Sequence, residues 1–196
     1  FRNHNICNLC TRNDFKPGIK FRCFQKSFWK SLIVNFNSKK INNFEEFYID
    51  KYVAISDHIR KYLIQLGIPQ SKIEMISNST KPQNKIRQDA NEFLFVGRLE
   101  PEKGIILVLD TWREYSNLPK LNIVGTGSVD KVAREYASSL ENVSFHGILN
   151  DDELNSVASK CRTLIAPISW DEPFGRNLIE ALSRGQSIVA TKRGIV

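Results

Sequence analysis

The strongest constraint on the fold is a regular alternation of short apolar runs and helix-like segments in the C-terminal half of the chain. The apolar runs have the length of strands and lie at residues 92–96, 120–124, 143–146, 163–168 and 187–191. The segments between them have the apolar spacing of helices and lie at residues 104–115, 129–140, 151–160 and 176–184. The Phe-Leu-Phe-Val run is apolar on both faces, which is typical of a buried parallel sheet. The alternation therefore predicts an α/β fold, a parallel sheet with right-handed crossovers flanked by helices.

A shorter strand–helix–strand unit precedes this region, at residues 51–56, 57–66 and 72–77. We expect Asp57 to cap its helix and Gly67 to end it. The polar composition of the segment that follows indicates a linker. The predicted organisation is the end of a first Rossmann-like domain, a linker and a second Rossmann-like domain, at residues 1–80, 81–91 and 92–196.

The turn after the fourth of these five apolar runs has the composition of a ligand site. Glu172, a Pro-Phe-Gly turn and Glu180 stand eight positions apart across the start of a predicted helix. Gly175 permits close backbone approach, and the helix start offers unpaired amides to a phosphate or a sugar oxygen. Carboxylates accept hydrogen bonds from hydroxyl groups, which favours a polyhydroxylated ligand that carries phosphate. Two solvated surface carboxylates are the alternative interpretation.

A second turn adds positive charge. Arg98 and Lys103 lie in the segment Gly-Arg-Leu-Glu-Pro-Glu-Lys-Gly, directly after the strand predicted at 92–96. An Arg fork and a mobile Lys charge before a helix start favour a diphosphate ligand, although such a pair on its own is also common in solvated loops. Four turns at predicted strand ends should meet in one cleft. They are Gly97-Arg98, Gly125-Thr126-Gly127, His146-Gly147 and Glu172 to Gly175.

A dehydrogenase is the obvious alternative for a Gly-x-Gly loop. The dinucleotide fingerprint opens the first βαβ unit and carries a third glycine. Gly125-Thr126-Gly127 follows the second strand of its domain, and the third glycine is missing at the required spacing. An oxidoreductase is therefore disfavoured.

Taken together, these segments resemble the retaining glycosyltransferases of family four, also called group 1, which have the GT-B fold. The resemblance rests on Gly-Arg-Leu-x-x-x-Lys-Gly at 97–104, on Gly125-Thr126-Gly127, and on the two glutamates Glu172 and Glu180 with Phe174-Gly175 between them. It implies a nearly complete donor-binding domain preceded by the end of an acceptor-side domain. Family members are about twice as long, so we expect the chain to be a fragment that is inactive by itself.

The resemblance also implies roles for individual residues. Arg98 and Lys103 would neutralise the diphosphate of the donor and Glu172 would hold hydroxyls of the transferred sugar, which makes these three the candidate catalytic residues. Glu180 would bind the ribose hydroxyls. The candidate donor-binding residues are Gly97, Gly125, Gly127, His146, Gly147, Phe174, Gly175, Arg176, Asn177, Leu178 and Glu180.

The expected activity is transfer of a sugar from a UDP-, GDP- or ADP-linked donor to a glycan or lipid-linked acceptor, with retention of anomeric configuration. In this family the leaving phosphate helps to deprotonate the acceptor, and neither a metal nor another cofactor is required. The alternatives are a GT-B-fold nucleotide-sugar epimerase, a non-catalytic partner of a glycosyltransferase, and a basic module that binds membranes or nucleic acid. Nucleic acid is not an expected partner, because the basic residues are scattered and no recognised motif is present.

The charge is distributed unevenly. Residues 1–90 hold 16 Lys and Arg against 7 Asp and Glu, a net charge of +9, whereas residues 91–196 have a net charge of −2. The run from Trp29 to Ile33, with Lys26, has the composition of a basic, amphipathic membrane contact, or of an ordinary packed helix. We expect a cytoplasmic protein that works at the cytoplasmic face of a membrane and contributes to polysaccharide synthesis for the cell envelope.

Three N-terminal cysteines raise the question of a metal. Cys7, Cys10 and Cys23, with His4 nearby, have a spacing that could form a structural zinc site. Reduced cysteines in a loop are the alternative, which a cytoplasmic location favours. Cys161 is expected at the end of a helix as an ordinary core residue.

Overall fold

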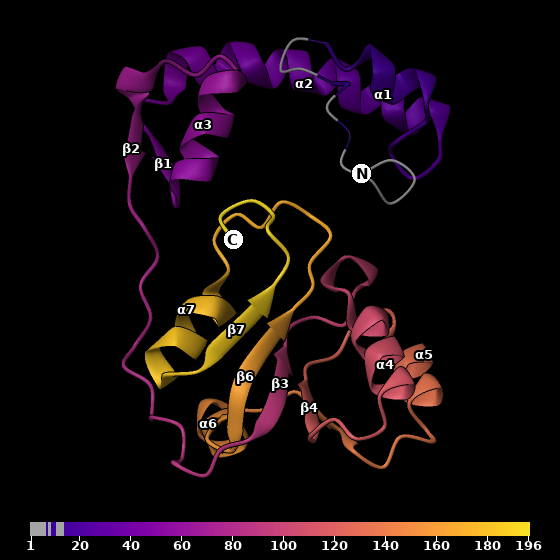
Figure 1. Ribbon diagram of the computed structural model, residues 1–196. Helices are drawn as coiled ribbons and strands as arrows, with labels where there is room; N and C mark the ends of the chain where they lie inside the picture. Colours follow the sequence, from indigo (N-terminus) through magenta and orange to yellow (C-terminus); the bar gives the residue numbers. More distant parts are fainter. Residues whose placement is uncertain (1–6, 8, 11–13) are drawn as a thin grey trace. The chain divides into compact units, whose positions relative to one another are not determined.

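The computed structural model describes residue 7, residues 9–10 and residues 14–196, and only the backbone of residues 39–47. The chain forms two compact units, Phe1–Ser77 and Asn78–Val196 (Figure 1). Within the part of the chain that is described, every helix is too short or too polar to cross a bilayer.

The first unit combines helices with a small parallel sheet. Its elements are α1 (Lys16–Lys20), α2 (Phe28–Tyr48), β1 (Tyr52–Ala54), α3 (Asp57–Gln65), η1 (Gln70–Lys72) and β2 (Ile73–Met75). Strand β1 pairs with β2 in parallel, with Tyr52 opposite Ile73. The predicted N-cap was wrong by one residue. Ser56 is the extended residue whose hydroxyl accepts the Ile59 amide, while Asp57 is already helical and forms an ion pair with Arg60.

The second unit is a five-stranded parallel sheet flanked by helices, which confirms the predicted α/β fold. Its strands are β3 (Glu92–Val96), β4 (Leu121–Val124), β5 (Val143–Gly147), β6 (Cys161–Ala166) and β7 (Ser187–Ala190). Its helices are η2 (Pro101–Lys103), α4 (Ile105–Glu114), α5 (Asp130–Tyr136), α6 (Asp151–Ala158) and α7 (Arg176–Arg184). The strand order is β5-β4-β3-β6-β7, so that the chain order reverses beside β3.

Two hydrophobic clusters cover the two faces of this sheet. Phe95 and Ile123 point to one face and pack with buried residues of α4 and α5. Leu94 and Val124 point to the other face and pack with residues of α6 and α7. Neighbouring strand residues alternate between the faces, which explains why these strands are apolar throughout. The helices thus bury both faces, and the carboxyl ends of β3 and β6 lie side by side at the switch in strand order.

Several element boundaries differ from the prediction, among them the start of β6 and the end of α5. Strand β6 begins at Cys161, which pairs with Glu92, so this cysteine starts a strand instead of ending a helix. It is fully buried, which confirms its place in the core. Helix α5 ends at Tyr136, four residues earlier than predicted. The next residues include Ser138 and Ser139, whose hydroxyls compete for backbone hydrogen bonds and weaken a helix.

Residues of the predicted linker belong to the second unit and form hydrogen bonds with its other elements. The amide of Ile86 donates to the Arg184 carbonyl at 3.0 Å, and the amide of Arg87 donates to the Ser159 carbonyl at 2.8 Å. The Arg184 guanidinium donates to Oε1 of Gln83 at 3.0 Å. The segment is therefore tied to the ends of α6 and α7.

Candidate active site

The centre of the site is an ion pair between two loops at the carboxyl ends of adjacent strands. Lys103 comes from η2, after β3, and Glu172 comes from the loop after β6. The Lys103 ammonium lies 2.9 Å from Oε2 of Glu172, and the two side chains are only 17% and 13% exposed. Because β3 and β6 are parallel neighbours, residues 69 positions apart meet at one edge of the sheet. The sequence predicted this meeting.

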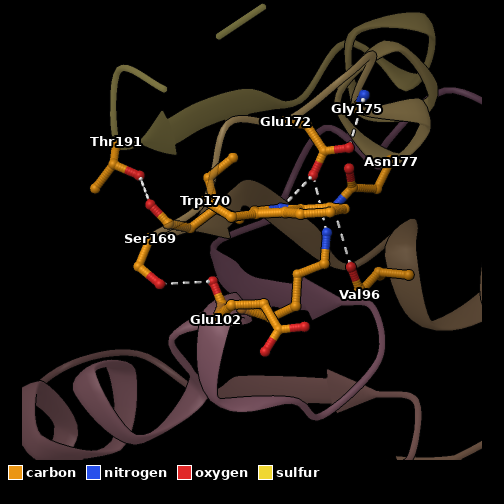
Figure 2. A network of polar contacts seen from close by, with 10 residues as sticks. Val96, Glu102, Ser169, Trp170, Glu172, Gly175, Asn177 and Thr191 are labelled. Atoms are coloured by element: carbon orange, nitrogen blue, oxygen red, sulfur yellow. Dashed lines mark hydrogen bonds and ion pairs between the residues drawn. The ribbon is translucent and has the colours of Figure 1, made fainter. Parts of the chain in front are cut away.

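Glu172 is held by further contacts (Figure 2). The indole Nε1 of Trp170 donates to Oε2 of Glu172 at 3.0 Å, and the Gly175 amide donates to Oε1 at 3.3 Å. The Lys103 ammonium also lies over the Trp170 ring, 4.7 Å from its centroid. The Glu172 backbone forms a bridge with Gly194, beyond the end of β7. The carboxylate is therefore fixed from several sides.

Backbone contacts fix the two loops against each other. The Ser169 amide donates to the Glu102 carbonyl at 2.9 Å, and the Thr191 hydroxyl donates to the Ile168 carbonyl. The Asn177 side chain donates to the Val96 carbonyl at 3.0 Å and ties the start of α7 to the end of β3. These bonds join three neighbouring loops into one structure beneath the ion pair (Figure 2).

Some of the predicted donor-binding residues at the start of α7 shape the turn or pack into the core, whereas others carry charge at the surface. Gly175 caps the helix with φ 74°, a left-handed conformation that favours glycine. The Leu178 side chain packs into the core, and its amide donates to the Gly175 carbonyl. Phe174 is half-buried. Arg176 and Glu180 form an ion pair at 3.7 Å, with Arg176 largely exposed.

Arg176 and Glu180 line a pocket of about 410 Å³ within the second unit. Its other lining residues are Ser79, Thr80, Lys81, Gln83, Asp151, Leu154 and Arg184. Neither Lys103 nor Glu172 belongs to this lining, so Glu180 lies in a pocket of its own beside the ion pair, and the first turns of α7 join the two places.

Several lining residues were not predicted to belong to a site. Arg184 is 3% exposed, and its guanidinium donates to Oδ1 of Asn155 at 3.2 Å. Burial lowers the pKa of Arg184. Ser79 and Thr80 belong to the predicted first domain, and Lys81 and Gln83 to the predicted linker. No local pattern marks these residues or Arg184 as part of a site, because their position depends on long-range packing.

The Gly-x-Gly loop is packed against the Gly97 turn. A Cβ atom on Gly125 would lie 2.0 Å from the Gly97 carbonyl oxygen, and one on Gly127 would lie 2.4 Å from that of Leu99. Both positions therefore require glycine for close packing of the two loops. Arg98, next to Gly97, is exposed. Glu100 accepts hydrogen bonds from the hydroxyl and the amide of Ser128, and these bonds lower the pKa of Glu100.

The His146 side chain contacts Asn122 of the neighbouring strand β4. Its Nε2 lies 2.9 Å from Oδ1 of Asn122, whose amide group donates to Oε2 of Glu92 at 2.7 Å. Burial is the main cause that lowers the pKa of His146. The backbone turns after it at Gly147, which has φ 70°. His146 therefore lies near the end of β5, with its side chain bonded to Asn122 of the neighbouring strand.

The predicted zinc site receives no support from the described cysteines. Cys7, Cys10 and Cys23 are free thiols, and the described residues contain no group of three or more His, Cys, Asp or Glu side chains arranged to hold a metal. His4 lies outside the described residues.

The parallel sheet with helices on both faces is the GT-B-type fold that the resemblance implied. Residues 77–196 match the family described as Glycosyl transferases group 1, and the chain belongs to this family.

Curated relatives include the O-antigen chain mannosyltransferase C of Escherichia coli, 32% identical over 73% of this chain and 40% of that protein. The phosphatidyl-myo-inositol mannosyltransferase of Mycobacterium tuberculosis is 28% identical over 71% of this chain and 39% of its own length. This chain therefore spans about two fifths of the length of these relatives.

Among solved structures, HepE of Anabaena in complex with UDP and glucose superposes with a TM-score of 0.69 at 20% identity. That superposition covers 81% of this chain and 49% of HepE. The lipopolysaccharide outer core galactosyltransferase WaaB has a TM-score of 0.61 at 24% identity, covering 74% of this chain and 44% of WaaB. At these identities, the two structures confirm the fold.

Proposed function

We propose that the complete protein transfers a sugar from a nucleotide-diphospho-sugar to a glycan or lipid-linked acceptor with retention of anomeric configuration. The observation that carries this proposal is the Lys103–Glu172 contact of 2.9 Å, at the edge of the sheet and beside the start of α7. A cation that can bind a diphosphate thus lies next to a carboxylate that can accept hydrogen bonds from sugar hydroxyls, which supports a nucleotide-sugar as the ligand.

Each of the charged residues has its own role in the proposed reaction. Lys103, together with Arg98, stabilises the negative charge that develops on the leaving diphosphate, and preorganised charge of this kind is effective in catalysis. Oε1 of Glu172 accepts hydrogen bonds from hydroxyls of the transferred sugar. Glu180, in the adjoining pocket, accepts hydrogen bonds from the ribose. The acceptor hydroxyl attacks the anomeric carbon from the face that the diphosphate leaves and gives its proton to the leaving phosphate, so retention needs neither a nucleophilic side chain nor a separate general base.

The names of the similar proteins support this chemistry. HepE was solved with UDP and glucose, and also with UDP-glucose. The two curated relatives named above are mannosyltransferases. A UDP- or GDP-linked hexose is the donor class that these names favour. By the same proposal, the protein works in the cytoplasm on polysaccharides or lipid-linked glycans of the cell envelope.

Replacement of Lys103 tests the proposal. In the complete protein, Lys103→Ala should lower kcat on the order of 10²–10³-fold, because one donor to the developing charge is lost. Lys131→Ala is the matched control, since the Lys131 side chain is 89% exposed on α5, and it should keep wild-type turnover. Transfer of radiolabelled sugar to an acceptor is the measurement, after calorimetric titration with UDP-, GDP- and ADP-sugars has identified the donor.

The outcomes separate the alternatives. Unchanged turnover of Lys103→Ala at saturating donor would contradict the assigned role. Isomerisation of the free donor without transfer would identify an epimerase. Failure to bind any nucleotide-sugar would indicate a non-catalytic partner.

We also propose that the first unit contacts an anionic membrane surface. Trp29, Ile33 and Phe36 lie on one face of α2 and are 71%, 59% and 62% exposed. Lys26 comes three residues before Trp29, and Lys30 follows it directly. Exposed aromatic and aliphatic side chains with neighbouring lysines are the combination that binds an anionic bilayer interface.

A further inference from the structure

Trp170 contacts both members of the central ion pair, although neither the family signature nor the predicted site includes it. Its Nε1 donates to Oε2 of Glu172 at 3.0 Å, and its ring lies under the Lys103 ammonium at 4.7 Å. The same Oε2 accepts from Lys103 at 2.9 Å. Indole, ammonium and carboxylate therefore form a closed set of three contacts (Figure 2).

This arrangement solves a physical problem of the site. A lysine side chain is long and flexible, and a largely buried ion pair is costly unless its hydrogen-bonding groups are satisfied. The indole supplies one donor to Glu172 and an attractive ring face to Lys103. Both charges are thereby held in place without a further charged residue.

The two carboxylate oxygens of Glu172 have different hydrogen-bond partners. Oε2 accepts from both Lys103 and Trp170, whereas Oε1 has, among the residues that the structure describes, a single longer contact of 3.3 Å with the Gly175 amide. Oε1 is therefore the oxygen with capacity for a ligand hydroxyl. The Lys103 ammonium has three N–H donors, and one of them is engaged by Glu172. The other two can bind diphosphate oxygens without breaking the ion pair.

We propose that Trp170 is a positioning residue of the transfer reaction, which fixes Oε2 of Glu172 and the Lys103 ammonium in one arrangement before the donor binds. This inference rests on the proposed function and adds to it a determinant of catalytic rate. Trp170 acts through Glu172 and Lys103.

The test uses two tryptophans of the same domain. Trp170→Phe keeps a ring near Lys103 and removes the hydrogen bond to Glu172, and Trp170→Leu removes both contacts. Trp112→Phe is the matched control, because the buried Trp112 donates through Nε1 to the Pro119 carbonyl at 2.9 Å, within the hydrophobic core. The measurements are kcat, donor KM and melting temperature in the complete protein.

We expect Trp170→Phe to lower kcat about tenfold with donor KM changed less than about threefold, since misplaced charge weakens transition-state binding most. Trp170→Leu should lower kcat by a larger factor, because it removes both contacts. Trp112→Phe should lower the melting temperature by about 2–4 °C and leave the kinetics of the folded protein unchanged. If Trp170→Phe keeps wild-type kcat, or only lowers the melting temperature as Trp112→Phe does, the inference is wrong.

A double-mutant cycle separates positioning from an independent effect. If Trp170 acts through Lys103, the loss in Trp170→Phe/Lys103→Ala should be smaller than the product of the two single losses. Multiplicative losses would overturn the inference while the transferase assignment stands. A wild-type protein that transfers no sugar from any donor would instead overturn the proposed function.

Discussion

His146 is a half-buried histidine whose neutral form is favoured by its surroundings. Burial lowers its pKa first, Lys120 and Lys160 lower it further, and Glu92 opposes them. Because its pKa in the folded protein is below the ordinary 6.5, the unfolded chain binds more protons in acid. Stability from this group is complete above about pH 6.5 and is lost as the pH falls below that value.

The measurement is the urea midpoint of the domain, compared at about pH 7.5 and about pH 5.5. The wild type should lose more stability over this interval than His146→Gln, which cannot take up the proton. Equal losses in the two proteins would contradict the assignment. The variant should be less stable at both pH values, since its bond to Asn122 is altered.

At the level of single residues, the sequence predicted that Lys103 and Glu172 would meet, but it did not predict Trp170 as their neighbour. Lys103 and Glu172 were expected to meet because their types and their places after strands pointed to one edge of the sheet. Trp170, two residues before Glu172, carried no such signal, since a tryptophan is usually a packing residue. Glu180 was assigned to the same cleft, yet its pocket is formed with residues 79–83, whose position only the folded chain defines.

At the level of elements, two glycines in left-handed backbone conformations have different neighbours. Gly104 lies between η2 and α4 with φ 76°, and a Cβ atom there would be 2.3 Å from the Pro167 carbonyl oxygen. Gly185 ends α7 with φ 84°, and a Cβ atom there would meet nothing within 4 Å. Alanine at Gly185 thus adds backbone strain alone, whereas alanine at Gly104 adds strain and a collision with backbone.

We expect Gly185→Ala to lower the free energy of unfolding by about 1–2 kcal/mol, the usual cost of the left-handed conformation. Gly104→Ala should cost at least about 3 kcal/mol, because the loops carrying Lys103 and Glu172 must separate. Urea denaturation followed by circular dichroism gives both values. If the two variants lost the same free energy of unfolding, the backbone around Pro167 would have moved at little cost to accommodate the new Cβ atom.

The elements themselves followed from periodicity and turn residues, but some boundaries did not. Strand β3 and helix α7 have the predicted bounds, since apolar runs and glycines mark their ends. The start of β6 at Cys161 depends on pairing with Glu92, a contact that local sequence does not encode. Likewise, Ser56 and not Asp57 caps α3, and both residue types are good caps.

At the level of the molecule, the basic charge and the exposed face of α2 predict salt-sensitive binding to anionic vesicles. Association of the complete protein with phosphatidylglycerol vesicles should weaken as salt rises from about 0.05 M to about 0.5 M. Trp29→Ala/Ile33→Ser should weaken it about tenfold or more, because two apolar side chains lose their place in the interface.

Val132→Ser is the control for this experiment. Val132 is 55% exposed on α5, in the second unit, and its loss should leave vesicle binding unchanged. Sedimentation with vesicles gives the affinities. The proposed membrane contact would be contradicted if the double variant at Trp29 and Ile33 bound vesicles with wild-type affinity. It would also be contradicted if the wild type bound neutral and anionic vesicles equally well.

The separation of 69 residues between Lys103 and Glu172 has a consequence for the order of folding. Their contact requires β6 to align beside β3 across two intervening strands and three intervening α-helices. Contacts that close such long loops form slowly, because chain entropy opposes them. We therefore expect local helices to form before this ion pair, so partly folded molecules would lack the paired charges on which the proposed cleavage of a nucleotide-sugar depends.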